Sequence, residues 1–202
     1  MPALWIASNN DKKRVELERL LSGLGYDLRL QREAPDAPEV EEDQPDFAGN
    51  AKLKAASLAR TVGALALGDD SGLCVDALDG RPGVRSARYA PGSDADRTAK
   101  LLEELSDVPR QRRGARFVCH VCLADPDGEV VARFEGTCDG VILEAPRGDK
   151  GFGYDPVFVA TAHGDIDQAP TFAELSAAQK DAVSHRGAAL RQLADFLRQH
   201  SP

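Results

Sequence analysis

The chain has 202 residues, of which 42% are hydrophobic, and a formal net charge of −8. This composition supports a folded core and excludes a disordered chain. The negative charge argues against broad nucleic-acid binding. No stretch approaches the roughly 20 apolar residues of a membrane span, and the N-terminus has no basic leader. We therefore expect a cytoplasmic protein without a membrane or nucleic-acid partner.

The first third of the chain is expected to alternate between strands and helices. Apolar runs predict strands, and leucines at helical spacing predict amphipathic helices. In chain order the expected elements are a strand at Leu4–Ala7, a helix with Leu17, Leu20, Leu21 and Leu24 on one face, a strand at Tyr26–Leu30, a helix capped by Asp46 and carrying Phe47, Ala51, Ala55, Leu58 and Val62, and a strand at Ala64–Gly68.

The remainder predicts a hairpin between helices. The expected elements are a helix at about Asp96–Leu105, strands at about Ala115–Ala124 and Glu129–Cys138 around the turn Asp125–Gly128, a glycine-rich segment at Gly148–Pro156, and a last helix with Leu190, Leu193, Ala194 and Leu197. Early alternation followed by a hairpin indicates one mixed α/β domain over residues 1–202. A second lobe would hold the hairpin, and the cleft between the lobes would be the ligand site.

The run Cys119-His120-Val121-Cys122 superficially resembles a metal-binding spacing. The surrounding residues alternate as in a strand, so Cys119 and Cys122 should point to opposite faces. Two thiolates on opposite faces cannot hold one zinc ion. The cysteines are therefore interpreted as structural.

An apolar run that ends in Asp69-Asp70-Ser71-Gly72 is the most informative feature of the chain. Paired carboxylates at the end of a buried strand are costly to desolvate unless a cation compensates them. Mg²⁺ takes oxygen ligands and often needs a carboxylate from a second element. Glu42, in an acidic loop, is the candidate second ligand, although acidic loops are commonly just solvated. The pattern favours a metal-dependent reaction.

Two segments suit phosphate groups. Ser8-Asn9-Asn10-Asp11-Lys12-Lys13 lies between a strand and a helix, where small polar residues leave backbone N–H groups free at a helix N-terminus. The alternative for this segment is an ordinary helix cap with surface lysines. Lys54 shares a helix face with Asn50. It is expected either to face the carboxylates, where it could neutralise them or hold a phosphate, or to be an ordinary surface lysine.

Two later segments suit a nucleobase. In Gly151-Phe152-Gly153-Tyr154-Asp155-Pro156 the glycines permit close backbone approach, Phe152 could stack on a base and Asp155 could accept hydrogen bonds from it. A tight structural turn is the alternative. Ser184-His185-Arg186-Gly187 follows Lys180, and its adjacent His185 and Arg186 can both donate to a keto oxygen or a phosphate. The alternative is a structural histidine.

Together, these motifs closely resemble the inosine/xanthosine triphosphate pyrophosphatase family over nearly the whole chain. The resemblance implies a central mixed, twisted sheet flanked by helices, two lobes, a homodimer, Mg²⁺ dependence, and hydrolysis of ITP, dITP and XTP to the monophosphate and pyrophosphate. It implies Asp70 and Glu42 as metal ligands, and Asp70, Lys13 and Lys54 as catalytic residues. The implied substrate-binding residues are Ser8, Asn9, Asn10, Asp11, Lys12, Lys13, Ser71, Phe152, Gly153, Tyr154, Asp155, Lys180, His185 and Arg186.

We hypothesise that Asp70 deprotonates a water that attacks the α-phosphorus, and that His185 and Arg186 select 6-keto purines. Two other functions compete with this one. A haloacid dehalogenase-type phosphatase would need an Asp-x-Asp pair near the first strand, and Leu4–Asn10 has none. A non-catalytic nucleotide-binding module would explain the lysines and glycine-rich loops, but not the three acidic residues Asp69, Asp70 and Glu42.

Overall fold

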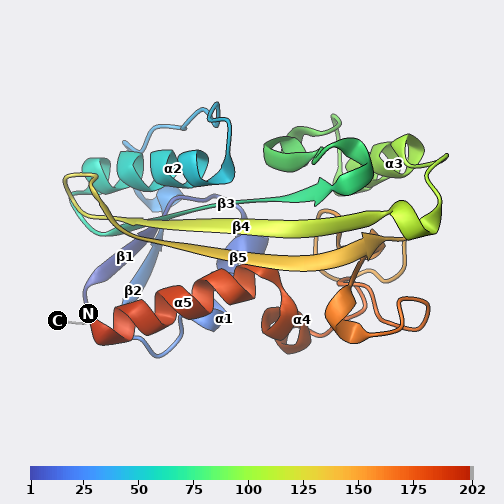
Figure 1. Ribbon diagram of the computed structural model, residues 1–202. Helices are drawn as coiled ribbons and strands as arrows, with labels where there is room; N and C mark the ends of the chain where they lie inside the picture. Colours follow the sequence, from blue (N-terminus) through green and yellow to red (C-terminus); the bar gives the residue numbers. More distant parts are fainter. Residues whose placement is uncertain (201–202) are drawn as a thin grey trace. The chain divides into compact units, whose positions relative to one another are not determined.

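The computed structural model describes residues 1–200, and Figure 1 shows the arrangement of its helices and strands. The strands are β1 (Ala3–Ile6), β2 (Asp27–Leu30), β3 (Ala66–Val75), β4 (Gly114–Ala124), β5 (Val130–Ile142) and β6 (Phe158–Ala160). The α-helices are α1 (Asp11–Leu20), α2 (Phe47–Val62), α3 (Asp94–Glu104), α4 (Ala177–Val183) and α5 (His185–Gln199). Among residues 1–200, no helix combines the length and apolar character needed to cross a membrane.

The strands form one six-stranded sheet in the order β2-β1-β3-β4-β5-β6. Strand β1 is parallel to β2, with Ala3 opposite Asp27, and parallel to β3, with Trp5 opposite Ala66. Strand β5 is antiparallel to β6. The sheet is therefore mixed, and the predicted α/β class is confirmed.

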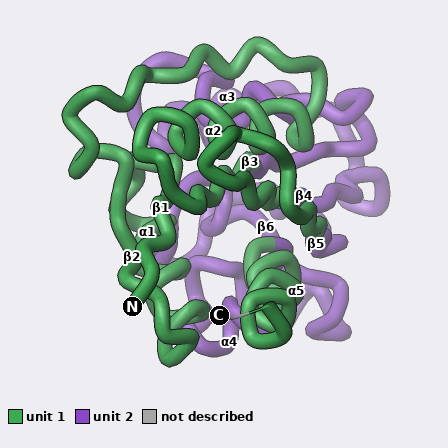
Figure 2. Tube along the Cα trace, turned by 90° about the vertical axis from the view of Figure 1, so that its left-hand side faces the viewer, with its two compact units in different colours: residues 1–70, 119–136, 186–202 green, residues 71–118, 137–185 purple. Residues whose placement is uncertain are grey.

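The chain divides into two compact units, coloured separately in Figure 2. The first comprises residues 1–70, 119–136 and 186 onward, and the second comprises residues 71–118 and 137–185. The expectation that one lobe holds the hairpin is wrong, because its turn belongs to the first unit and the far ends of both strands belong to the second. The physical reason is length: β4 and β5 have 11 and 13 residues, and a strand rises about 3.3 Å per residue.

The first unit has an apolar cluster on each face of its strands. One cluster joins leucines of α1 and α5 to β1, β3 and β4, and includes Cys119. The other joins alanines of α2 to Ala66 and includes Cys122. In Figure 1, α2 and α5 accordingly lie on opposite sides of these strands. The placement of the two cysteines in different clusters confirms that they point to opposite faces.

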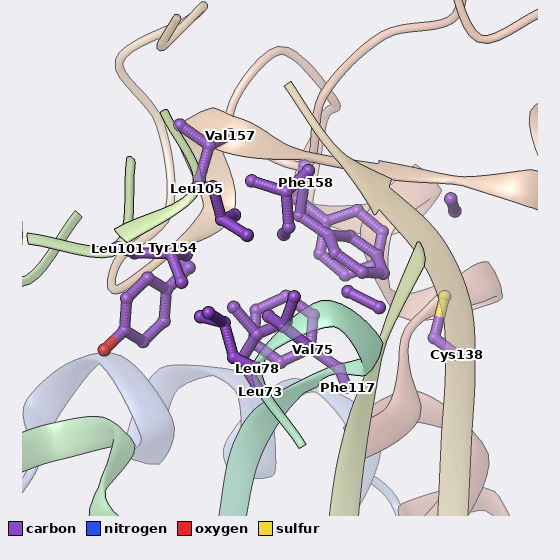
Figure 3. Close-up of a cluster of buried hydrophobic side chains, with 14 of the residues drawn as sticks. Leu73, Val75, Leu78, Leu101, Leu105, Phe117, Cys138, Tyr154, Val157 and Phe158 are labelled. Atoms are coloured by element: carbon purple, nitrogen blue, oxygen red, sulfur yellow. The ribbon is translucent and has the colours of Figure 1, made fainter. Parts of the chain in front are cut away.

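The second unit has its own aromatic core (Figure 3). Phe158 packs edge-on against Phe117 and Phe172, with ring centroids 4.7 and 4.9 Å apart. Leucines of β3 and α3, together with Tyr154, complete this cluster. Through Tyr154, this core supports the segment Gly151–Pro156.

The expected strand at Ala64–Gly68 is wrong in its extent, because β3 continues through Asp69 and Asp70 to Val75. The carboxylates thus lie inside the strand rather than at its end. A strand can continue through buried charges when each one is paired, and the structure provides those partners. The short elements β6 and α4 were not predicted, since three- and seven-residue segments carry little periodicity.

Candidate active site

Asp69 and Asp70 are consecutive buried residues of β3, with 3% and 5% of their surface exposed. Successive side chains of a strand point to opposite faces. Asp69 therefore faces α1 and α5, whereas Asp70 faces α2. The two carboxylates occupy different environments, although they are neighbours in sequence.

Asp69 is surrounded by positive charge. The Lys13 Nζ atom lies 3.1 Å from its Oδ2 atom, and the Arg186 Nε atom lies 3.4 Å from the same oxygen. Arg186 also donates through Nη1 to Glu16 at 2.7 Å. Burial by itself would raise the pKa of Asp69, but the charges of Lys13 and Arg186 outweigh burial and lower that pKa well below its ordinary value. Asp69 is therefore held ionised.

Asp70 is held by two residues of α2. Asn50 donates through Nδ2 to its Oδ2 atom at 3.0 Å, and the Lys54 Nζ atom lies 3.1 Å from its Oδ1 atom. The same ammonium lies 3.0 Å from Glu42 Oε1. Burial raises the pKa of Asp70, and the nearby charge of Glu42 raises it further, against the opposing effect of Lys54. A carboxylate with a raised pKa is a better proton acceptor, which is the property that a general base requires.

Local sequence explains why α2 reaches Asp70. Its N-terminus is capped by Asp46, whose carboxylate accepts from the Gly49 N–H group at 2.7 Å, and its C-terminus ends at Gly63 in the left-handed conformation. Gly68 of β3 lies against the α2 backbone, and a Cβ atom there would overlap the carbonyl of Ala51. Glycine at this position therefore permits the close packing that brings Asn50 and Lys54 to Asp70.

The donor chemistry at Glu42 and Asp70 fits a hard cation. Both are carboxylates, and one ammonium group already lies between them. Mg²⁺ is commonly held by one or two carboxylates together with water and substrate phosphate. Residues 1–200 contain no group of three or more His, Cys, Asp or Glu side chains arranged to hold a metal ion. Any ion here would thus need ligands beyond these two side chains.

The Ser8–Lys13 segment forms the entry to α1 but differs from its prediction in one respect. Asn10 caps the helix, and its Oδ1 atom accepts from the N–H groups of Lys12 and Lys13 at 3.0 and 3.2 Å. These two amides are therefore not free for phosphate, because a capping side chain competes for them. Ser8 accepts from Asn10 N–H, Asn9 is exposed, and Asp11 pairs with Arg32 at 2.8 Å.

In the second unit, the residues assigned to a nucleobase gather around Asp155. Its Oδ2 atom accepts from the Phe152 N–H group at 2.8 Å and from Lys180 Nζ at 2.7 Å. The Lys180 ammonium also lies 4.6 Å from the centre of the Phe152 ring. Gly151 has φ +74°, and a Cβ atom there would collide with the Asp155 carboxylate. The structure thus brings Phe152, Asp155 and Lys180 together.

The remaining predicted residues are placed less directly. His185 is buried and stacks on Phe117, with ring centroids 4.7 Å apart. Ser71 follows Asp70 in β3 and is half-buried. Arg186, the neighbour of His185 in sequence, is buried against Asp69 and Glu16. The predicted joint action of His185 and Arg186 on a keto oxygen remains a prediction.

Two residues of this site were not among those predicted to act. Asn50 is fully buried and bridges elements, because its Oδ1 atom accepts from Gln44 N–H while its Nδ2 atom donates to Asp70. Its spacing from Lys54 was the signal that could have found it. Glu16 has no such signal, since an acidic residue on an amphipathic helix resembles any other solvated one.

Comparison with known proteins agrees with this geometry. The model of the Ham1 family matches residues 4–196. A dITP/XTP pyrophosphatase of Geobacter sulfurreducens is 48% identical over 199 residues, covering 98% of this chain and 97% of the relative. One from Frankia alni is 47% identical over 201 residues, covering 96% of each chain.

Two solved structures are also similar. A HAM1 protein from Coxiella burnetii has a TM-score of 0.88 and 38% identity, covering 98% of this chain and 100% of the other. A nucleoside-triphosphatase / dITP/XTP pyrophosphatase from Mycobacterium abscessus has a TM-score of 0.75 and 45% identity, covering 95% and 98%.

Fold and site thus define an α/β protein in which buried carboxylates are paired with lysines. The chain belongs to the Ham1 family. The resemblance inferred from the sequence motifs is confirmed.

Proposed function

We propose that this protein hydrolyses the non-standard purine nucleoside triphosphates ITP, dITP and XTP to the nucleoside monophosphate and pyrophosphate. Its relatives named dITP/XTP pyrophosphatase match nearly the full chain. The observation that carries the proposal is the arrangement of Asp70, Lys54 and Glu42: a buried carboxylate with a raised pKa beside a lysine ammonium shared with a second carboxylate.

In this proposal Asp70 is the general base. It accepts a proton from water as the water oxygen bonds to the α-phosphorus, and the bond from that phosphorus to the bridging oxygen breaks with pyrophosphate as leaving group. Asn50 donates a hydrogen bond to one Asp70 oxygen, and Lys54 donates one to the other, so both oxygens are oriented. Lys54 and Lys13 supply positive charge for the phosphate oxygens.

Mg²⁺ is the proposed cofactor, held by Glu42 and Asp70. When bound, the ion neutralises charge that develops on the phosphate oxygens. The Lys54 ammonium would have to share Glu42 and Asp70 with the ion, so Lys54 is the residue expected to move toward the phosphates.

Recognition of the base is assigned to Phe152, Asp155, Lys180, His185 and Arg186. Phe152 would stack on the purine, and Lys180 would keep Asp155 in place to accept hydrogen bonds. His185 and Arg186 would donate to the 6-keto oxygen, which adenine lacks. A buried donor left without its acceptor costs about 1–3 kcal/mol. Ser71 and the segment Ser8–Lys13 are proposed to contact the triphosphate.

A substrate screen tests the proposal. The purified protein is incubated with each purine triphosphate and Mg²⁺, and the products are identified by ³¹P NMR. We expect XTP, dITP and ITP to give monophosphate and pyrophosphate, with turnover abolished by EDTA and restored by Mg²⁺. Release of orthophosphate would instead indicate a phosphatase, and binding without turnover would indicate a non-catalytic module.

Three further properties are part of the proposal. Residues 1–202 are taken as one functional domain, because the family model spans 4–196 and so includes both compact units. The protein is proposed to be a homodimer, which light scattering of the purified protein tests. Its proposed location is the cytoplasm, which fractionation of the source cells tests.

A further inference from the structure

The backbone of Gly153, within the segment assigned to the nucleobase, is held by side chains of another element. Its N–H group donates to Asp94 Oδ2 at 2.8 Å. Its carbonyl accepts from Thr98 Oγ1 at 3.4 Å. Asp94 and Thr98 lie one turn apart on α3. All three residues belong to the second unit, so the contact forms within one compact body.

Asp94 is itself fixed in place. Arg97 donates through Nη2 to Asp94 Oδ1 at 2.6 Å, and through Nη1 to the Gly92 carbonyl at 3.0 Å. The two carboxylate oxygens therefore accept from different groups: Oδ1 accepts from Arg97, and Oδ2 accepts from the Gly153 N–H group. A carboxylate held in this way is a preorganised acceptor, and hydrogen bonds to charged groups are stronger than neutral ones.

The segment needs such a support because its glycines do not fix its conformation. Gly151 and Gly153 both have positive φ, at +74° and +62°. Glycine loses more conformational freedom on ordering than any other residue. Phe152 lies between them, with its own N–H group on Asp155 at 2.8 Å and the next N–H group on Asp94. Asp155 and Asp94 thus hold the two peptides that flank the Phe152 ring.

The geometry points to Asp94 as a positioning residue for purine recognition, a role that rests on the proposed function because it assumes that Phe152 contacts the base. Asp94 holds the Gly153 peptide, and through it Phe152, in the conformation that receives the purine. A free segment would have to be ordered by the substrate itself, which weakens binding. Loss of Asp94 therefore acts on KM and leaves the chemical step unaltered.

The kinetic test compares Asp94→Ala with Asp94→Asn and with Asp96→Ala. Asp96 is a matched control because it also lies in the first turn of α3, where its carboxylate accepts from Ser93 N–H at 2.6 Å, within the helix cap. We expect Asp94→Ala to raise KM for XTP about tenfold with little change in kcat. Asp94→Asn keeps an acceptor oxygen and should recover most of the loss, and Asp96→Ala should leave KM near the wild-type value.

A second variant and a second readout keep the inference testable without Asp94→Ala. Thr98→Val removes the other hydrogen bond and should raise KM by about two- to threefold. Amide hydrogen exchange at Gly153, followed by NMR without nucleotide, should be about tenfold faster in Asp94→Ala than in Asp96→Ala if Asp94 holds this peptide, and about two- to threefold faster in Asp94→Asn, which keeps a neutral acceptor.

The outcomes separate the two proposals. The positioning role is overturned if the wild type is active and KM is no higher in Asp94→Ala and Thr98→Val than in Asp96→Ala. The role is also overturned if kcat falls while KM stays constant, or if Asp94→Asn is as impaired as Asp94→Ala. A wild type that hydrolyses no purine triphosphate rejects the proposed function, and the exchange rate of Gly153 then still decides whether Asp94 holds the segment.

Discussion

The Lys54 ammonium lies 3.1 Å from Asp70 Oδ1 and is shared with Glu42 at 3.0 Å. The side chains of Lys54 and Asp70 are only 11% and 7% exposed, so solvent screens this pair weakly. The charges of Asp70, Asp69 and Glu42 outweigh the burial that would lower the pKa of Lys54, and raise that pKa above its ordinary value. Lys54 therefore stays charged and opposes the rise in the pKa of Asp70.

The first prediction concerns the titration of Asp70 in metal-free protein. Its pKa is raised above the ordinary value, and Lys54 is the largest influence in the opposite direction. Replacing Lys54→Met should therefore raise the pKa of Asp70 further. The measurement is a ¹³C NMR titration of the carboxyl carbons. Lys52→Met is the control, because Lys52 is exposed on another face of α2. An Asp70 pKa that falls or stays constant in Lys54→Met contradicts the assignment.

A second prediction concerns stability and Asp69. Its pKa is lowered in the folded protein, so the ionised group stabilises the fold above the unfolded-state pKa of about 4. That contribution is lost as the pH falls through the folded-state pKa. Asp69→Asn leaves Lys13 and Arg186 without a counter-charge and should lower the free energy of unfolding by about 3 kcal/mol at neutral pH.

Urea unfolding at several pH values measures this effect. The difference between Asp69→Asn and wild type should narrow below about pH 4, where the Asp69 carboxylate of the unfolded chain begins to take up a proton while that of the folded protein stays ionised. Asp139→Asn is the control, an exposed aspartate of β5 whose replacement should change stability by less than about 0.5 kcal/mol. A difference that is the same at every pH would show that charge pairing at Asp69 is not the cause.

A third prediction concerns stacking on the base. Phe152→Ala should raise KM for XTP about tenfold, because aromatic stacking contributes about 1–3 kcal/mol per base, while kcat changes little. Steady-state kinetics with XTP and dITP measures both constants. Phe134→Ala is the control, since Phe134 packs on Phe196 in the first unit. Equal KM values in the two variants would remove Phe152 from the binding site.

Local patterns in the sequence were sufficient to predict much of this fold. The helical face of α2, its cap at Asp46 and the close spacing of Asn50 and Lys54 are all properties of a contiguous segment. The same holds for the opposite orientations of Cys119 and Cys122, which follow from the period of a strand. Such features depend on neighbours in the chain, so they can be inferred without a three-dimensional structure.

Features that depend on distant partners could not be predicted. Asp69 and Asp70 are adjacent and chemically identical, but the charges of Lys13 and Arg186 lower the pKa of Asp69, whereas burial and the charge of Glu42 raise that of Asp70. Asp94 bonds to a glycine 59 positions away. Neither pairing leaves a periodic signal, because each depends on how the sheet and helices meet.

The most direct test of the whole account is the turnover of Asp70→Asn. The variant keeps the size of the side chain and one acceptor oxygen, but it cannot accept the proton from water. We predict a folded protein, by circular dichroism and thermal unfolding, whose kcat for XTP with Mg²⁺ is lower by about 10³-fold. A folded variant that releases pyrophosphate within about tenfold of the wild-type rate would contradict the assignment of Asp70 as the general base.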